Sequence, residues 1–180
     1  MGAPLCSGLQ NSEVALYANP VNPTFAYSAQ AVAAVAASYP VVCIEAGPAK
    51  NFRLKRVVIW NPGAQTTPGF VTFSLVRTTA AGSGTTAVPA PFDTADTAFS
   101  GILRIPGQTA GTAGTVVYQF ALWVPGAAAA ASPFVIDFSD FTTQKDLVVL
   151  SGITNGVFLR CDTGGAGMAG LSFSVEFTEE

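Results

Sequence analysis

Short apolar runs separated by glycine, proline and asparagine are the feature that most restricts how this chain can fold. The runs are rich in Val, Ile, Phe, Thr and Leu, which favour extended strands, and signals for helices are scarce. They cover residues Tyr39–Glu45, Phe52–Asn61, Gly69–Thr78, Thr115–Val124, Pro133–Phe138, Asp146–Leu150, Gly156–Arg160 and Gly170–Thr178. About eight strands in two antiparallel sheets is the count of a jelly roll. The sequence therefore predicts an all-β, jelly-roll-like antiparallel β-sandwich with long Gly/Thr/Ala-rich loops.

Two of the runs differ in how polar and apolar side chains alternate. The run over residues 70–77 alternates threonine and serine with large apolar side chains, so one of its faces is expected to meet water. The run over residues 116–124 carries aromatic or large apolar side chains on both faces, which is typical of a strand covered on both sides. A neighbouring subunit is one such cover. Tyr118, Phe120 and Trp123 are therefore candidate interface residues.

The chain is predicted to hold one domain, residues 28–180, preceded by an extended arm over residues 1–27 that prolines interrupt. Alanine-rich residues 29–37 are compatible with a short helix by propensity or with an edge strand by position. Residues 94–99 are compatible with a single helical turn that Asp93 would cap.

Charged residues make up only 11% of the chain, against roughly 25% in a typical soluble protein. A surface with so few charges suits burial against a partner, although an ordinary domain with a threonine-rich surface would have the same composition. The net charge of -3 argues against binding to nucleic acid, which needs clustered Lys and Arg.

Four of the eight cations nevertheless cluster, at Lys50, Arg53, Lys55 and Arg56. The cluster is interpreted as a charged strand edge that discourages wrong pairing, or alternatively as one side of a salt bridge to a partner subunit. Arg53, Lys55 and Arg56 therefore join the candidate interface residues. The alternation of this run loses its phase after Lys55, at Arg56–Val57, which predicts a β-bulge.

The three cysteines, Cys6, Cys43 and Cys161, are odd in number and far apart, so they predict neither a disulfide framework nor a zinc site. Cys43 and Cys161 are expected to be buried as small apolar residues of a protein made in a reducing cytoplasm. The N-terminus lacks the basic and apolar regions of a secretory signal. Prolines and polar residues interrupt the uncharged stretch over residues 14–44, so we expect a soluble protein.

Enzyme chemistry finds little support in the sequence. The chain has no histidine, which removes the commonest general base and metal ligand, and no pair of carboxylates is singled out as in a glycosidase. We therefore predict a protein that is not an enzyme and that has no catalytic, cofactor-binding or metal-binding residues.

Acidic and aromatic residues allow two binding interpretations. The acidic pairs Asp93 with Asp96 and Asp137 with Asp140 offer too few oxygens for calcium and are expected to cap turns. The tryptophans, Trp60 and Trp123, suit either sugar stacking or the core, and their apolar strands favour the core.

Residues Thr78–Ala98 and Pro133–Phe138 carry a resemblance to known sequences. The first stretch leads from a threonine-rich strand through a Gly-Thr loop into a Pro-x-Pro turn, Pro89-Ala90-Pro91. This order resembles small structural proteins of tailed bacteriophages, and the second stretch is similar to a later part of the same proteins.

The resemblance implies a virion component, with a capsid decoration or cement protein as the first choice. It implies synthesis in the host bacterial cytoplasm and assembly as a homotrimer that contacts the major capsid protein or another virion protein. Nucleic acid, membrane and cofactors are not expected partners. A tail or connector component, or a carbohydrate-binding or adhesive β-sandwich, are the alternative functions.

Overall fold

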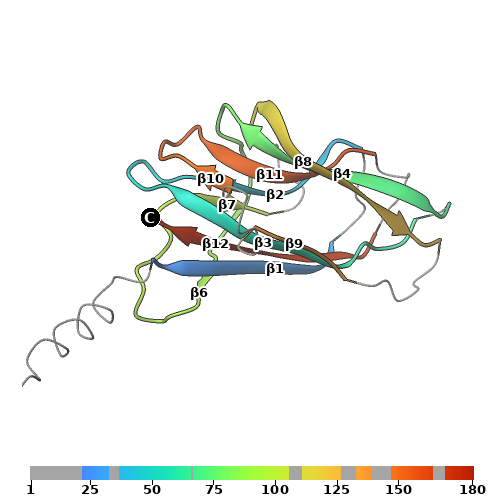
Figure 1. Ribbon diagram of the computed structural model, residues 1–180, viewed down its shortest axis with the longest axis horizontal. Coiled ribbons are helices and arrows are strands. Elements are labelled where there is room, and N and C mark those ends of the chain that lie inside the picture. The colour runs from blue at the N-terminus through green and yellow to red at the C-terminus, as the bar shows by residue number, and fades with distance from the viewer. Residues whose placement is uncertain are drawn as a thin grey trace, which may run out of the picture.

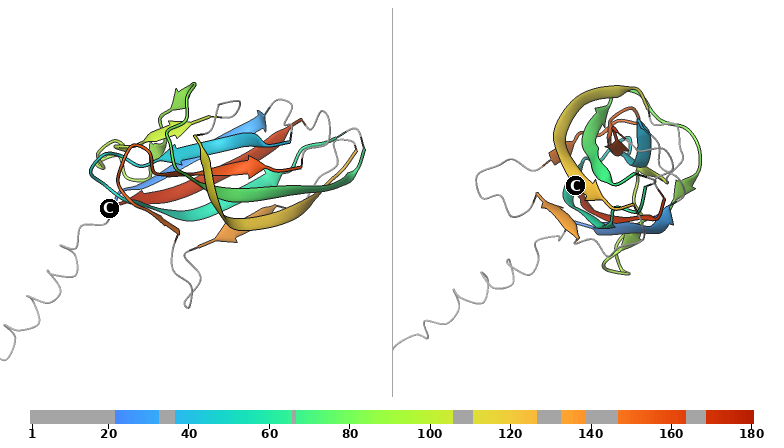
Figure 2. Two further views of the ribbon diagram at one scale, coloured as in Figure 1. Left: turned by 90° about the horizontal axis from the view of Figure 1, so that it is seen from above. Right: turned by 90° about the vertical axis from the view of Figure 1, so that its right-hand side faces the viewer.

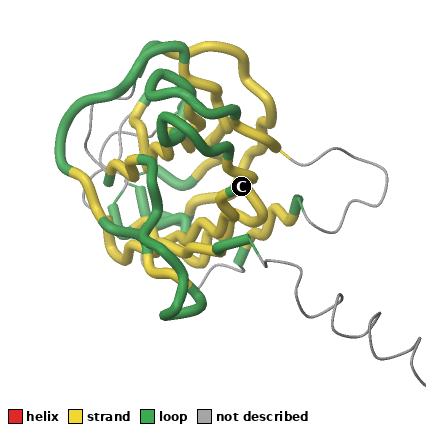
Figure 3. The backbone as a smooth tube through the Cα atoms, turned by 90° about the vertical axis from the view of Figure 1, so that its left-hand side faces the viewer, coloured by secondary structure: helices red, strands yellow, loops and turns green. Residues whose placement is uncertain are grey.

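Antiparallel β-strands form the regular structure of the described residues, without helices among them (Figure 3). The computed structural model describes residues 22–32, 37–65, 67–105, 111–126, 133–138, 147–163 and 169–180. The strands in these ranges are β1 (Thr24–Val32), β2 (Tyr39–Glu45), β3 (Phe52–Asn61), β4 (Gly69–Thr78), β5 (Thr86–Ala87), β6 (Ala90–Pro91), β7 (Ile102–Arg104), β8 (Ala113–Val124), β9 (Phe134–Asp137), β10 (Leu147–Val149), β11 (Gly156–Cys161) and β12 (Leu171–Glu179).

The strands form two sheets that pack face to face (Figures 1 and 2). Sheet I has the order β10-β3-β12-β1-β6, and β9 also pairs with β3. Strands β10 and β9 pair with successive parts of β3, so they follow one another along its length. Sheet II has the order β5-β7-β2-β11-β4-β8. These two sheets confirm the predicted all-β antiparallel sandwich.

Each of the eight predicted runs lies on a strand, and the runs that became β2, β3 and β4 agree with the structure at both ends. The predicted bulge in β3 is also confirmed. Glu176 of β12 pairs with Arg56, whereas the next residue, Phe177, pairs with Leu54, so Lys55 is the extra residue. The extra residue lets Leu54 and Val57 both face the core, which explains the loss of phase in the sequence.

Strand β1 begins inside the segment predicted as an arm. Residues 1–21 of that segment lie outside the described residues, but Thr24–Tyr27 pairs with β12, and Phe25 is fully buried. The boundary at residue 27 is therefore too late by at least four residues. The alanine-rich segment, which is compatible with a helix or a strand by sequence, is a strand as far as Val32, where β1 ends, and residues 33–36 are not described.

The short connection after β6 is a turn rather than a helix. Asp93 Oδ1 accepts a hydrogen bond from the Ala95 amide at 2.9 Å, as expected for a residue that caps a turn. Residues 94–99 contain no helix, so the alternative of a helical turn is wrong.

The core between the sheets is packed with aliphatic and phenylalanine side chains. At one end Phe25, Phe52, Phe99 and Phe177 form a cluster in which ring centroids lie 4.9–6.4 Å apart. These distances are those of favourable aromatic pairs. The cluster ties β1, β3 and β12 to the loop that contains Phe99, so the sandwich is a rigid support for its edges.

Buried carboxylates fix the loops at the same end of the sandwich. Glu45 receives hydrogen bonds from Nε of Arg104 at 3.0 Å and from Nη2 at 2.9 Å, and also from the amide of Gly82. Glu179 accepts hydrogen bonds from the Ser100 amide at 2.9 Å and from Lys50 Nζ at 3.1 Å. Both carboxylates are almost fully buried, so these contacts satisfy charges that water cannot reach.

Cys43 and Cys161 are buried and free, as predicted, whereas Cys6 lies outside the described residues. Burial raises the pKa of each of the two thiols to about 12. A second, smaller cause is a nearby carboxylate, Glu45 for Cys43 and Asp162 for Cys161. Both thiols are therefore held in their neutral form.

Candidate functional site: the β8 edge of the sandwich

Strand β8 forms one outer edge of sheet II and differs from the other outermost strands in length. The others contain two to four residues each, and such short edge strands offer little backbone to a foreign strand. Strand β8 contains 12 residues, and β4 is its only partner among the described residues. Its free edge therefore presents a long row of backbone donors and acceptors.

Strand β1 is also partly uncovered, because β6 pairs only with Phe25 and Ala26. A bulge between Ala29 and Val32 then interrupts it, and Ala31 has a positive φ of 49°. This irregularity limits the regular edge that β1 offers. Strand β8 also has two register shifts in its pairing with β4, but its residues Tyr118–Val124 pair regularly, so β8 is the more accessible template for strand pairing.

The side chains of β8 lack the features that usually protect an edge. Residues Ala113–Val124 include no charged residue and no proline, which are the residues that most often prevent edge-to-edge contact. Most of the strand is exposed, including Val116, Val117, Tyr118 and Trp123. An exposed, apolar and long edge strand is the expected signature of a surface that pairs with another chain.

Inward-facing aromatic residues of β8 close the gap to sheet I. Phe120 stacks on Phe73 of β4, with ring centroids 5.6 Å apart, and on Phe134 of β9, with centroids 4.7 Å apart. Tyr118 contacts Phe120 and Phe138, but 40% of its surface remains exposed. Aromatic side chains therefore line the place where the β8 edge approaches β9.

Outward-facing residues of β8 form a second exposed surface. Trp123 lies against Phe70 of β4 in an edge-to-face contact with centroids 5.3 Å apart. The exposed fractions are 54% for Trp123 and 71% for Phe70. Trp60 is 41% exposed, so the expectation that both tryptophans belong to the core is wrong. Both tryptophans lie on the outward side of strands that are apolar on both faces, and for this reason an apolar strand sequence did not lead to burial.

A polar network connects side chains of β4, β8 and β11 on the outer face of sheet II. Asp162 accepts hydrogen bonds from Ser74 Oγ at 2.9 Å and Gln119 Nε2 at 3.1 Å, and it pairs with Arg160. Gln119 belongs to β8, so this network fixes the orientation of a polar side chain on the edge strand. Asp162 and Arg160 carry opposite charges, and their pairing leaves the surface nearly neutral.

The predicted interface residues fall into two separate groups. Tyr118, Phe120 and Trp123 lie on β8 of sheet II, with Tyr118 and Phe120 facing inward and Trp123 facing outward. Arg53, Lys55 and Arg56 lie on β3 of sheet I, and the structure does not bring them together with the aromatic residues. Whether either group contacts a partner stays a prediction.

The interpretation of the cation cluster as a strand edge is wrong, because β3 lies inside sheet I between β12 and the β9 and β10 strands. Arg53 pairs with Glu180, and Lys50 pairs with Glu179. Arg56 stands opposite Glu176 on one side and Asp137 on the other. Acidic side chains of the same chain therefore accompany this cluster, which reduces the charge available to a partner.

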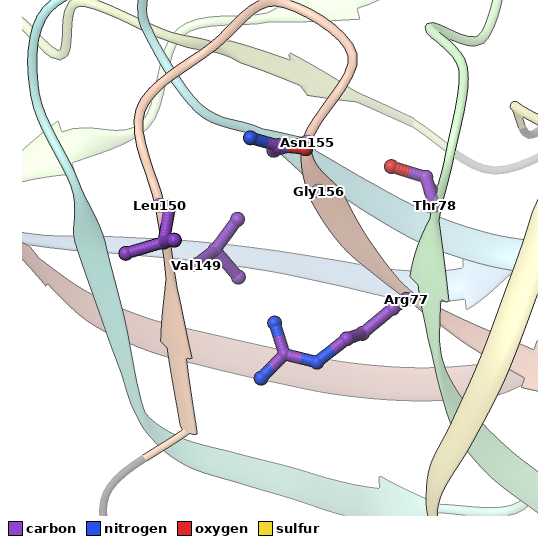
Figure 4. Close-up of a pocket in the computed structure, with 6 residues that line it drawn as sticks. All are labelled: Arg77, Thr78, Val149, Leu150, Asn155 and Gly156. Atoms are coloured by element: carbon purple, nitrogen blue, oxygen red, sulfur yellow. The ribbon is translucent and has the colours of Figure 1, made fainter.

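A shallow hollow lies between β4 and the connection from β10 to β11 (Figure 4). Its lining residues are Arg77, Thr78, Val149, Leu150, Asn155 and Gly156. Arg77 donates from Nη1 to the backbone oxygen of Val148 at 2.9 Å, so this side chain bridges the two sheets. The hollow contains no carboxylate that could work as a general acid or base.

The described residues include no group of three or more His, Cys, Asp or Glu side chains placed to hold a metal ion. They also include no helix with the length and apolar character needed to cross a membrane. No protein-family model matches the chain, and no curated protein is detectably similar to it in sequence.

Proposed function

We propose that the protein is a structural component of a bacteriophage virion, most specifically a capsid decoration protein that self-associates and stabilises the head. The observation that carries this proposal is the β8 edge, which is long, uncharged and aromatic, on a tightly packed sandwich. A protein that works by assembly needs a rigid body and a surface suited to another chain. The resemblance of residues 78–98 to phage structural proteins supplies the virion context.

The strand order supports a jelly-roll form of the sandwich. Strands β1 to β4 pass alternately between sheet I and sheet II, and β9, β11 and β12 do so again later in the chain. Such crossings place strands that are consecutive in the sequence in different sheets, as in the Greek-key connections of jelly rolls. Jelly rolls are common in capsid proteins, which makes this connectivity compatible with the proposed role.

The proposal is tested by locating the chain in purified particles of the phage that encodes it. We expect a reconstruction of the particle to show the sandwich on the outer surface of the head, in contact with the major capsid protein. Particles assembled without the chain should have intact shells that disassemble at a lower temperature. Density on the tail or connector would support the related alternative, and absence from the particle would refute a virion role.

A carbohydrate-binding role is the second candidate, and the exposed Trp123–Phe70 pair is the observation that favours it. Aromatic rings at a surface can stack against sugars, although these two rings meet edge to face and expose no shared flat platform. Titration of the protein with a panel of glycans, followed by tryptophan fluorescence, tests this role. A saturable change that Trp123→Ala abolishes would favour sugar binding, whereas an unchanged signal would argue against it.

A further inference from the structure

We propose that the segment Tyr118–Val124 of β8 pairs antiparallel with the same segment of a second copy of this chain, with Ala121 on the twofold axis. The inference rests on the proposed function, because it specifies how the copies of a self-associating protein would meet. It goes further by naming the partner strand, its direction and its register.

The proposed segment is the regular part of the edge strand. Residues Tyr118–Val124 pair one to one with Leu75–Gly69 of β4. The register then shifts, because Leu75 pairs with Tyr118 whereas Val76 pairs with Val116. Val117 is therefore an extra residue in β8, and a bulge of this kind interrupts strand pairing. A regular pairing partner is expected to stop at Tyr118.

Symmetry restricts the register of two identical antiparallel strands. A twofold axis that relates them must stand perpendicular to the sheet and pass beside one residue or between two. Only an axis beside a residue places inward-facing side chains opposite inward-facing side chains. The middle residue of Tyr118–Val124 is Ala121, so an axis there allows the whole regular segment to pair.

The inward face of this register is apolar throughout. Leu122 of one copy stands opposite Phe120 of the second copy, and Val124 stands opposite Tyr118 of the second copy. Aromatic and branched side chains placed directly opposite each other stabilise antiparallel strands. Tyr118 and Phe120 are both partly exposed in the single chain, so the pairing would cover surface that now meets water.

The outward face is complementary in hydrogen bonding. Trp123 stands opposite Gln119 of the second copy, and the indole N–H is a donor. Gln119 donates a hydrogen bond from Nε2 to Asp162 at 3.1 Å. Its Oε1 is the atom of the same amide that can accept a hydrogen bond from the indole. The small side chain of Ala121 meets itself on the axis without crowding. The segment contains no charged residue, so two identical copies can approach each other without repulsion between like charges.

A cysteine at residue 121 tests the register directly. Opposite residues of antiparallel strands have Cα atoms about 4.5 to 5.5 Å apart, within the range of a disulfide. In a Cys6→Ser background, we expect Ala121→Cys to form a covalent dimer under mild oxidation at micromolar concentration. The matched control is Thr94→Cys, which is exposed in the loop after β6 and should stay monomeric on denaturing gels. Failure of Ala121→Cys to cross-link faster than the control would overturn the proposed register.

A charged side chain at residue 121 tests the contact without a covalent cross-link. Ala121→Glu places two carboxylates face to face on the axis, and we expect its association to weaken by at least about tenfold, which corresponds to about 1.4 kcal/mol. Thr94→Glu adds the same charge elsewhere and should associate as the natural chain does. Circular dichroism and thermal unfolding of both variants establish that each remains folded.

The native mass separates this inference from the proposed function. A dimer, or a larger assembly with an even number of chains, agrees with β8 pairing. A trimer, which is the assembly that the resemblance implies, would overturn β8 pairing and leave the decoration role standing, because the role does not depend on a twofold contact. A chain that stays monomeric but binds capsids would likewise overturn only the inference. A dimer that is absent from the particle would refute the virion role alone.

Discussion

Glu45 and Arg104 show how single residues hold this sandwich together. Glu45 is 1% exposed, and its carboxylate is held by both the Arg104 side chain and the amide of Gly82 in the loop after β4. Arg104 also approaches the backbone oxygen of Gly84. The pair therefore links β2 and β7 to the loop between β4 and β5. Removal of either side chain leaves the other buried charge without a partner of opposite charge.

Arg104→Met is expected to lower the free energy of unfolding by about 3–5 kcal/mol, because Glu45 would remain buried without a partner of opposite charge. Urea denaturation followed by circular dichroism measures the change. Arg53→Met is the control, since its pair with Glu180 is more exposed and contributes about 0–1 kcal/mol. Equal losses in the two variants would show that burial of the Glu45–Arg104 pair has no special importance.

The buried thiols predict how stability depends on pH. Burial raises the pKa of Cys43 and of Cys161 from 9.0 to about 12. Between these values the folded chain keeps protons that the unfolded chain releases, so stability is fully present below pH 9 and falls as the pH rises toward 12. Urea midpoints at a series of pH values measure the slope. Cys161→Ala should unfold with a shallower pH dependence, and an unchanged slope would contradict the assignment.

At the level of elements, β1 shows that residues from Thr24 onward belong to the folded body. Its residue Phe25 is fully buried against Phe99 and Phe177, and the Pro23 oxygen accepts a hydrogen bond from the Glu179 amide. A strand with these contacts contributes to the core. The preceding residues, 1–21, are the part of the predicted arm that deletion can remove without loss of these contacts.

Deletion of residues 1–21 is therefore expected to leave the unfolding temperature within a few degrees of that of the full chain. Deletion of residues 1–27 removes Phe25, and loss of a buried phenylalanine costs about 3–5 kcal/mol even without the lost strand pairing. Differential scanning calorimetry of the two shortened chains distinguishes them. If residues 1–21 also bind the capsid, the chain that lacks residues 1–21 should remain folded but should not bind capsids in a sedimentation assay.

The long strands could be predicted from the sequence because β-branched and aromatic runs ended at or near glycine, proline or asparagine, as for Phe52–Asn61, which Pro62 and Gly63 follow. The extra Lys55 in β3 was visible as a break in alternation. Strands β5, β6 and β7 contain two or three residues, too few for any periodic pattern. The exposure of Trp123 could not be predicted, because an apolar strand at the rim of a sheet has the same sequence pattern as one at its centre.

For the whole molecule, the distribution of charge predicts how association responds to salt. The β8 edge has no charged residue, whereas the cations of the β3 cluster lie on the other sheet. If copies meet through β8, raising the salt from about 0.05 to about 0.5 M should leave the dissociation constant nearly unchanged or lower it, since screening acts on charges. Sedimentation equilibrium measures it. A severalfold weakening would instead indicate a contact through Arg53, Lys55 and Arg56.

The position of β12 has a consequence for how the protein is made. This strand follows all other described strands in the chain, yet it lies in the interior of sheet I, where it pairs with both β1 and β3. Those two strands cannot complete their pairing in sheet I until residues 171–179 have left the ribosomal exit tunnel. The nascent chain then holds apolar strands without their central partner, which is a state that chaperones bind. A chain that stops before β12 is therefore expected to lack the central pairing of sheet I and to remain unfolded.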